Sequence, residues 1–100
     1  MTINELKKKL EAKISNALEE VAKHLTESVR AAAPVDTGEL RDSVDYEQES
    51  ALEFQVMAGT DHCVYVEFGT VAHPPNPFFR RTMSDEQDRM SQIFKEACEA

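Results

Sequence analysis

The chain has 100 residues, 41% hydrophobic and 30% charged, and its nineteen acidic and eleven basic side chains give a formal charge of −8. This composition is too apolar for a disordered chain, and no apolar run reaches the roughly 20 residues that span a bilayer. The negative charge repels phosphate backbones, so we expect no direct contact with nucleic acid. Because no apolar run is long enough to span a bilayer, we expect no membrane partner either. We expect a single domain over residues 1–100, and the cytoplasm as its default compartment because residues 1–9 show no secretory signal.

A long amphipathic helix is the first element that the pattern predicts. Its apolar residues recur at steps of three and four: Ile3, Leu6, Leu10, Ile14, Ala17, Leu18, Val21, Leu25 and Val29. We expect Thr2 or Asn4 to cap its start and Pro34 to end it near Ala32, because the residue before a proline avoids helical torsions. So long a helix projects beyond the core of a small domain, and Leu6 and Leu10 are therefore candidate interface residues.

A short helix and then strands are expected in the middle of the chain. In Asp36–Ser43, Asp36 can cap free amides and Glu39, three residues later, can complete a capping box, which predicts one or two helical turns. A strand is expected at Val44–Glu49, and clean alternation of apolar and polar residues predicts another that includes Leu52–Ala58.

A turn at Gly59–Asp61 leads to another alternating series, Val64–Phe68, which predicts a further strand. The prolines of Val71–Pro77 predict a stiff loop, because proline fixes its own torsion and lacks a backbone donor. Asn76 is then a good cap for a helix with Pro77 at its first position. Apolar residues mark one face of that helix: Phe79, Met83, Met90, Ile93, Phe94 and Ala97.

The order of these elements predicts the α+β class. We expect a long N-terminal helix, a short helix, an antiparallel β-meander of two to four strands, and a C-terminal helix packed on the sheet.

Three segments carry more specific information than the rest of the chain. They are Ala33-Pro34-Val35-Asp36-Thr37-Gly38-Glu39-Leu40-Arg41-Asp42-Ser43, Tyr65-Val66-Glu67-Phe68-Gly69-Thr70, and Pro74-Pro75-Asn76-Pro77-Phe78-Phe79-Arg80. Together they resemble the head-tail joining and tail-completion proteins of long-tailed phages and prophages. Members have a long N-terminal helix and then a P-x-D-T-G-x-L-x-x-S signature, a Y-x-x-x-E-x-G-T segment and a P-x-P-F segment before the last helix. Here Tyr65 stands closer to Glu67 than in that pattern.

The resemblance implies a structural role without catalytic residues, cofactors or metal. It implies a protein that completes the tail or joins it to the head, in the host cytoplasm during assembly and at the head-tail junction or tail end of the virion. The implied partners are further copies of itself in a ring, and other neck, connector or tail proteins. The motif residues that it identifies are Pro34, Asp36, Thr37, Gly38, Leu40, Ser43, Tyr65, Glu67, Gly69, Thr70, Pro75, Pro77 and Phe78.

Several of these residues also have a direct physical interpretation. Gly38 and Gly69 are expected to permit tight turns or positive φ. Glu67 is either an exposed carboxylate or an acceptor for a loop amide, Thr70 or a basic side chain. Phe78 and Phe79 are adjacent, so both are buried or one ring turns outward as an interface anchor.

Three other classes of function compete with this one. Asp36-Thr37-Gly38 matches the triplet of dimeric aspartic proteases, but a helix and a proline precede it instead of the all-β surroundings that a shared carboxylate pair needs. A metal site at Asp61, His62, Cys63 and His73 lacks the spacing of a four-ligand zinc site. An adaptor or regulatory protein that binds partners through its amphipathic helix, with no phage context, is the alternative that stays open.

Overall fold

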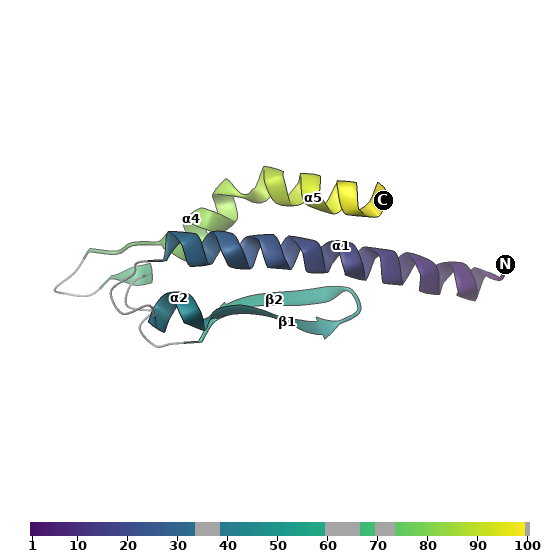
Figure 1. Ribbon diagram of the computed structural model, residues 1–100, viewed down its shortest axis with the longest axis horizontal. Coiled ribbons are helices and arrows are strands. Elements are labelled where there is room, and N and C mark those ends of the chain that lie inside the picture. Colours follow the sequence, from purple (N-terminus) through teal and green to yellow (C-terminus); the bar gives the residue numbers. More distant parts are fainter. Residues whose placement is uncertain (34–38, 60–66, 70–73, 100) are drawn as a thin grey trace.

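The computed structural model describes residues 1–33, 39–59, 67–69 and 74–99. The molecule is elongated, with principal extents of 62 × 23 × 19 Å. Helix α1, Ile3–Ala32, forms its spine, with a β-hairpin on one side and the C-terminal helices on the other (Figure 1). The expected α+β class is therefore confirmed.

Helix α1 begins and ends as the sequence predicts. Of the two candidate caps, Thr2 is the one used: its hydroxyl accepts a hydrogen bond from the amide of Glu5 at 3.2 Å, and the Glu5 carboxylate accepts one from the Thr2 amide. Ala33, the residue before Pro34, is already extended, with φ −67° and ψ 138°. This matches the steric exclusion of helical torsions before proline.

The middle of the chain forms α2, Glu39–Ser43, followed by β1, Val44–Ser50, and β2, Glu53–Ala58. The two strands pair antiparallel, with Val44 opposite Ala58, and the register shifts between Gln48 and Ser50. The short helix and both strands of this hairpin are confirmed, although Leu52 lies in the turn and not in the strand. The proposed capping box at Asp36 lies outside the described residues.

The prediction of a strand at Val64–Phe68 is wrong for its last two residues. Glu67 and Phe68 have helical geometry, and residues 64–66 lie outside the described part of the chain. So short an apolar series fits the two-residue period of a strand and the 3.6-residue period of a helix equally well, because Val64 and Phe68 are also one helical turn apart in sequence. The exposed ring of Phe68 does not continue a buried alternating face.

The C-terminal region forms two helices where the pattern predicted one: α4, Phe78–Asp85, and α5, Gln87–Glu99. The chain bends at Glu86, whose φ of −95° and ψ of 3° leave the helical range. Asn76 does not cap α4; Pro77 occupies the N-cap position, and the Asn76 side-chain oxygen instead accepts a hydrogen bond from Arg81 at 3.3 Å.

The C-terminal helices do not pack on the sheet as expected. Both α4 and α5 lie on α1, on the side opposite the hairpin (Figure 1). The reason is geometric: a two-stranded ribbon is about as wide as one helix, and α1 already covers the face that the ribbon turns inward. None of the described helices combines the length and the hydropathy that crossing a bilayer requires.

The buried core gathers around the C-terminal half of α1. It comprises Leu25, Val29, Ala33, Leu40, Val44 and Phe78. Phe79, Met90 and β2 residues Val56 and Ala58 pack against its edge. At the other end of the helix every residue from 1 to 10 is exposed, so the apolar stripe of α1 is covered along only part of its length.

Truncation of Phe78, which is 1% exposed, is expected to remove a large part of the stability of the fold. We predict that Phe78→Ala lowers the free energy of unfolding by about 3–5 kcal/mol, because it creates a cavity beside Val29 and Val44. Met83→Ala, at an exposed position of α4, should stay within about 0.5 kcal/mol of the parent. Urea unfolding followed by circular dichroism measures both changes, and equal losses would contradict this placement of the core.

Candidate functional site

A buried carboxylate joins the middle motif to the last helices. Glu67 is 5% exposed, and its two oxygens accept hydrogen bonds from the backbone amides of Phe79 at 3.0 Å and Arg80 at 3.1 Å. The N-cap residue of α4, Pro77, makes no side-chain capping bond. Glu67 therefore supplies in its place the anionic acceptor that the free amides of a helix N-terminus require.

Arg80 completes this arrangement from α4. Its Nε donates to the Glu67 carboxylate at 2.7 Å and its Nη2 donates to the Glu67 backbone carbonyl at 3.3 Å. The guanidinium also lies over the ring of Phe68, 4.6 Å from the ring centroid, in cation–π geometry. Of the two interpretations of Glu67, the hydrogen-bond acceptor is confirmed, with Arg80 as the basic side chain.

The ionisation of Glu67 reflects two opposing effects. Burial raises its pKa and is the largest single influence, but the hydrogen bonds from the Arg80 guanidinium and from the amides of Phe79 and Arg80 together outweigh it. The pKa of Glu67 therefore lies below its ordinary value, and the carboxylate is charged at neutral pH.

The adjacent phenylalanines have different surroundings. Phe78 is buried in the core, whereas Phe79 is half-buried at its edge, with the two rings 6.4 Å apart in an edge-to-face arrangement. Phe78 is thus wrong as a candidate interface residue, because the glutamate cap fixes the first turn of α4 with this ring directed toward α1. Phe79 keeps part of its ring accessible.

The structure brings residues of all three motifs together. Leu40, from the first, is 3% exposed and shares the core with Phe78, from the third, and the Ser43 hydroxyl closes the α2 turn by donating to the Leu40 carbonyl at 2.7 Å. Gly69, after Glu67, has a φ of 80°, so its predicted positive φ is confirmed. Pro75 is exposed and Pro77 half-buried. The remaining motif residues lie outside the described part of the chain: Pro34, Asp36, Thr37, Gly38, Tyr65 and Thr70.

Sequence reasoning missed one contact between distant helices. His24 of α1 is half-buried, and its Nε2 lies 2.8 Å from the Glu86 carboxylate at the bend between α4 and α5. The two residues are 62 positions apart, and neither belongs to a motif. No local pattern signals such a pair.

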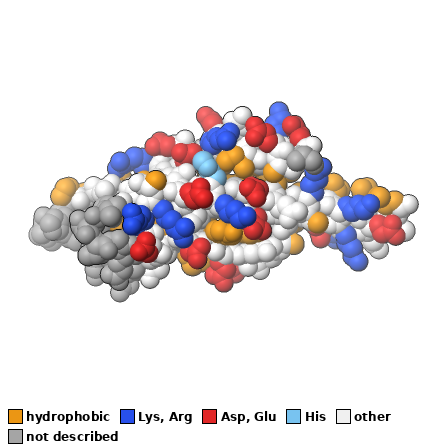
Figure 2. Space-filling view, in the orientation of Figure 1, with side chains coloured by type: hydrophobic (Ala, Val, Ile, Leu, Met, Phe, Trp, Pro, Cys, Tyr) orange, Lys and Arg blue, Asp and Glu red, His pale blue; other side chains and the backbone are white. Residues whose placement is uncertain are grey.

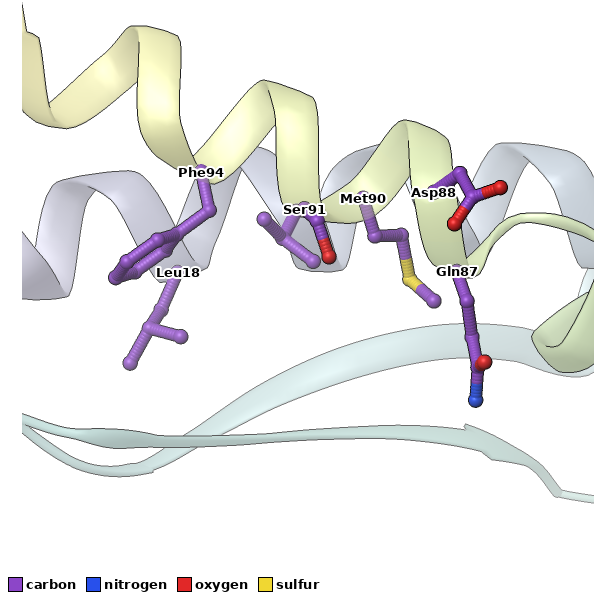
Figure 3. Close-up of a pocket in the computed structure, with 7 residues that line it drawn as sticks. Leu18, Gln87, Asp88, Met90, Ser91 and Phe94 are labelled. Carbon is purple, nitrogen blue, oxygen red and sulfur yellow. The ribbon is translucent and has the colours of Figure 1, made fainter.

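Two hollows adjoin each other along α1. One, of about 500 Å³, lies between α1 and α5, and Phe94, Met90, Leu18 and Val21 contribute to its lining (Figure 3). The other, of about 250 Å³, lies between α1 and β2 and shares Leu18 and Val21 with the first. The two hollows meet at Leu18 and Val21 of α1, between α5 and the hairpin, and we call them together the groove. Its lining is mostly apolar and also includes polar residues of α5, namely Gln87, Asp88 and Ser91.

The first thirteen residues form a projecting segment, which we call the arm. It extends past the end of α5 and past the tip of the hairpin (Figure 1), and apolar side chains and lysines are visible together at this end of the molecule (Figure 2). Leu6 and Leu10 are 47% and 51% exposed, as expected of candidate interface residues. Within the described residues, no group of three or more His, Cys, Asp or Glu side chains is placed to hold a metal ion.

Comparison with protein families identifies the group to which this architecture belongs. Residues 2–69 match the HK97-gp10-like family, described as "Bacteriophage HK97-gp10, putative tail-component". The chain belongs to this family. Neither the curated proteins nor the solved structures that were compared with the chain gave a match.

Membership in the HK97-gp10-like family supports a structural role in a phage. The matched region covers α1, α2 and the hairpin and ends at Gly69, before α4 and α5. Glu67 lies inside it, and the amides that Glu67 holds lie outside it. The cap is thus one of the contacts by which the family region positions the last two helices, together with the packing of Phe78 in the core and the His24–Glu86 pair.

Removal of the charge at Glu67 is expected to weaken this cap. We predict that Glu67→Gln lowers the free energy of unfolding by about 2 kcal/mol at neutral pH. The uncharged glutamine side chain cannot form the ion pair with Arg80, and its NH2 group would face the N–H donors of Phe79 and Arg80. Glu27→Gln, at an exposed position of α1, is the matched control and should change stability little.

The pH dependence of this loss follows from the direction of the pKa shift. Because the folded pKa of Glu67 is below the unfolded value of about 4.3, its stabilisation is complete above that value and is lost as the pH falls toward the folded pKa. The difference between wild type and Glu67→Gln should therefore shrink as the pH falls from about 7 to about 3. Urea unfolding across that range measures it, and a difference that grows in acid would refute the assignment.

The positive φ of Gly69 leads to a further prediction. An L residue in this conformation is strained whatever space surrounds it, so Gly69→Ala should lower the free energy of unfolding by about 1–2 kcal/mol. Gly59→Ala is the control, because its added Cβ would meet its nearest neighbour, the Ser43 carbonyl oxygen, at 3.9 Å, an ordinary contact. Thermal unfolding of both variants gives the comparison, and similar melting temperatures for the two would argue against strain at Gly69.

Proposed function

We propose that this protein completes the tail of a long-tailed phage or prophage, or joins the tail to the head, and that it acts by oligomerisation and by binding other virion proteins, not by catalysis. The observation that carries the proposal is the family match over residues 2–69. The site of action is then the head-tail junction or tail end of the virion, reached from the host cytoplasm during assembly.

The surface of the described residues supports a binding role. The hydrogen bonds of Glu67 and the His24–Glu86 pair join one part of the fold to another. On the arm, in contrast, apolar side chains are exposed, because no described element of the same molecule covers them. Exposed apolar residues that follow one helical stripe are typical of a surface that is covered in an assembly.

Assembly as a ring requires each copy to use two different surfaces. A heterologous contact joins one patch to a different patch on the next copy, and repetition closes only at a particular rotation. The elongated molecule places the arm and the Glu67 cap at opposite ends, so it has well-separated surfaces for neighbours and for other neck, connector or tail proteins (Figure 1).

Deletion of the gene in its phage or prophage tests this function directly. We expect induced lysates to contain filled heads apart from tails, or tails of aberrant length, when particles are viewed by negative-stain electron microscopy. Plasmid-borne wild-type protein should restore joined particles. Normal infectious virions from the deletion strain would reject the proposal and favour the adaptor that binds partners through its amphipathic helix.

A further inference from the structure

We infer that the arm of one copy, residues 1–13, docks into the groove of a second copy, between that copy's α5 and its hairpin. The inference rests on the self-association proposed above and names the two surfaces that meet. It follows from four features of the described residues: an uncovered apolar stripe, a groove with a mostly apolar lining, opposite net charges on the arm and on the groove wall, and an unbroken helix that prevents the arm from filling its own groove.

The arm carries the uncovered part of a continuous apolar stripe. Ile3 is 85% exposed, and with Leu6 and Leu10 it follows steps of three and four along α1. The same periodicity continues into Leu18 and Val21, which form the floor of the groove. The stripe is therefore covered by the molecule's own elements at one end of α1 and by nothing described at the other.

The groove presents apolar side chains from three elements. Leu18 and Val21 lie on its floor, Met90 and Phe94 come from α5, and Leu52 and Phe54 come from the hairpin. Figure 3 shows Phe94 and Leu18 beside the same space, with Met90 directed from α5 toward the hairpin. A groove between two walls of this kind suits an amphipathic helix whose residues one turn apart point into it.

Charge complements this apolar match. The arm holds four lysines and two glutamates, whereas residues 14–100 hold seven basic and seventeen acidic side chains. The hairpin wall, Val44–Ala58, contains four acidic side chains and no basic one, and Glu53 and Asp88 line the hollows themselves. A basic arm is thus attracted to the acidic wall of another copy, and this attraction decreases as salt screens it.

The geometry of α1 requires that the contact be intermolecular. The arm and the floor of the groove are parts of one unbroken helix, Ile3–Ala32, so the arm cannot turn back onto its own groove. About three turns of helix cover less than the roughly 800 Å² per partner of a standard interface. A single contact is therefore weak, and we expect association that depends on protein concentration.

Directed crosslinking of the full chain tests which surfaces meet. In a background with both cysteines replaced by serine, one copy carries Leu6→Cys and a second, distinguished by a tag, carries Ser91→Cys on α5. A short bismaleimide should give mainly the mixed Leu6→Cys/Ser91→Cys product. The control pairs Leu6→Cys with Met83→Cys, an exposed position on α4 outside the groove, and should give at least five-fold less product.

Sedimentation equilibrium provides the second measurement. The double variant Leu6→Glu/Leu10→Glu should shift the protein to monomer, and Met83→Glu should not, because all three residues are exposed but only the leucines lie on the arm. Added salt should weaken the wild-type association at least several-fold. Circular dichroism verifies that each variant is folded.

The outcomes separate this inference from the proposed function. A dominant Leu6→Cys homodimer means that arms pair with one another, which overturns docking in the groove but keeps self-association. The inference is also overturned if the wild-type protein stays monomeric at every concentration and the cysteine variants give no mixed product. Where Leu6→Glu/Leu10→Glu then fails to restore infectivity to the deletion strain, the arm binds a different virion protein, and the proposed function stands without this contact.

Discussion

The carboxylate of Glu67 holds the first turn of α4 by accepting two backbone amides and the guanidinium of Arg80. Helix α4 has only eight residues, follows a proline-rich segment, and receives no side-chain cap from Pro77. A helix this short is marginal by itself, so its position depends on tertiary contacts. Because the cap fixes the first turn, Phe78 enters the core beside Val29, and the following bend at Glu86 lays α5 along α1.

Helix α1 serves two purposes with one amphipathic pattern. Its C-terminal half is the floor of the core, where Leu25 and Val29 meet α2, the hairpin and α4. Its N-terminal part carries the same apolar periodicity with no described element against it. In a chain of this size the covered area is limited, and the length of α1 exceeds what the hairpin and α5 can shield. The uncovered part is the surface that the proposed assembly would bury.

The recognisable motifs describe how the fold is held together more than where partners bind. Leu40, Ser43, Glu67, Gly69 and Phe78 form a turn, a cap, a positive-φ junction and a core contact. The surfaces proposed here for binding, the arm and the groove, consist of apolar side chains at helical spacing without a signature of their own. In this chain the motif residues therefore stabilise the architecture, and the amphipathic pattern of α1 decides which apolar side chains that architecture leaves exposed.

The sequence by itself determined the elements that depend on local chemistry. The side chains and torsions of neighbouring residues account for the start of α1, for which the sequence offered Thr2 or Asn4 as the cap, and for its end before Pro34. They also account for the short helix, the hairpin and the positive φ at Gly69. Tertiary structure decided the rest: the helical geometry at Glu67 and Phe68, the division of the last helix at Glu86, and the packing of α4 and α5 on α1 instead of on the sheet. These features depend on partners 12 to 62 residues away, such as Phe79 for Glu67 and His24 for Glu86. Periodicity records which face of an element is apolar, but only the folded chain determines which element covers that face.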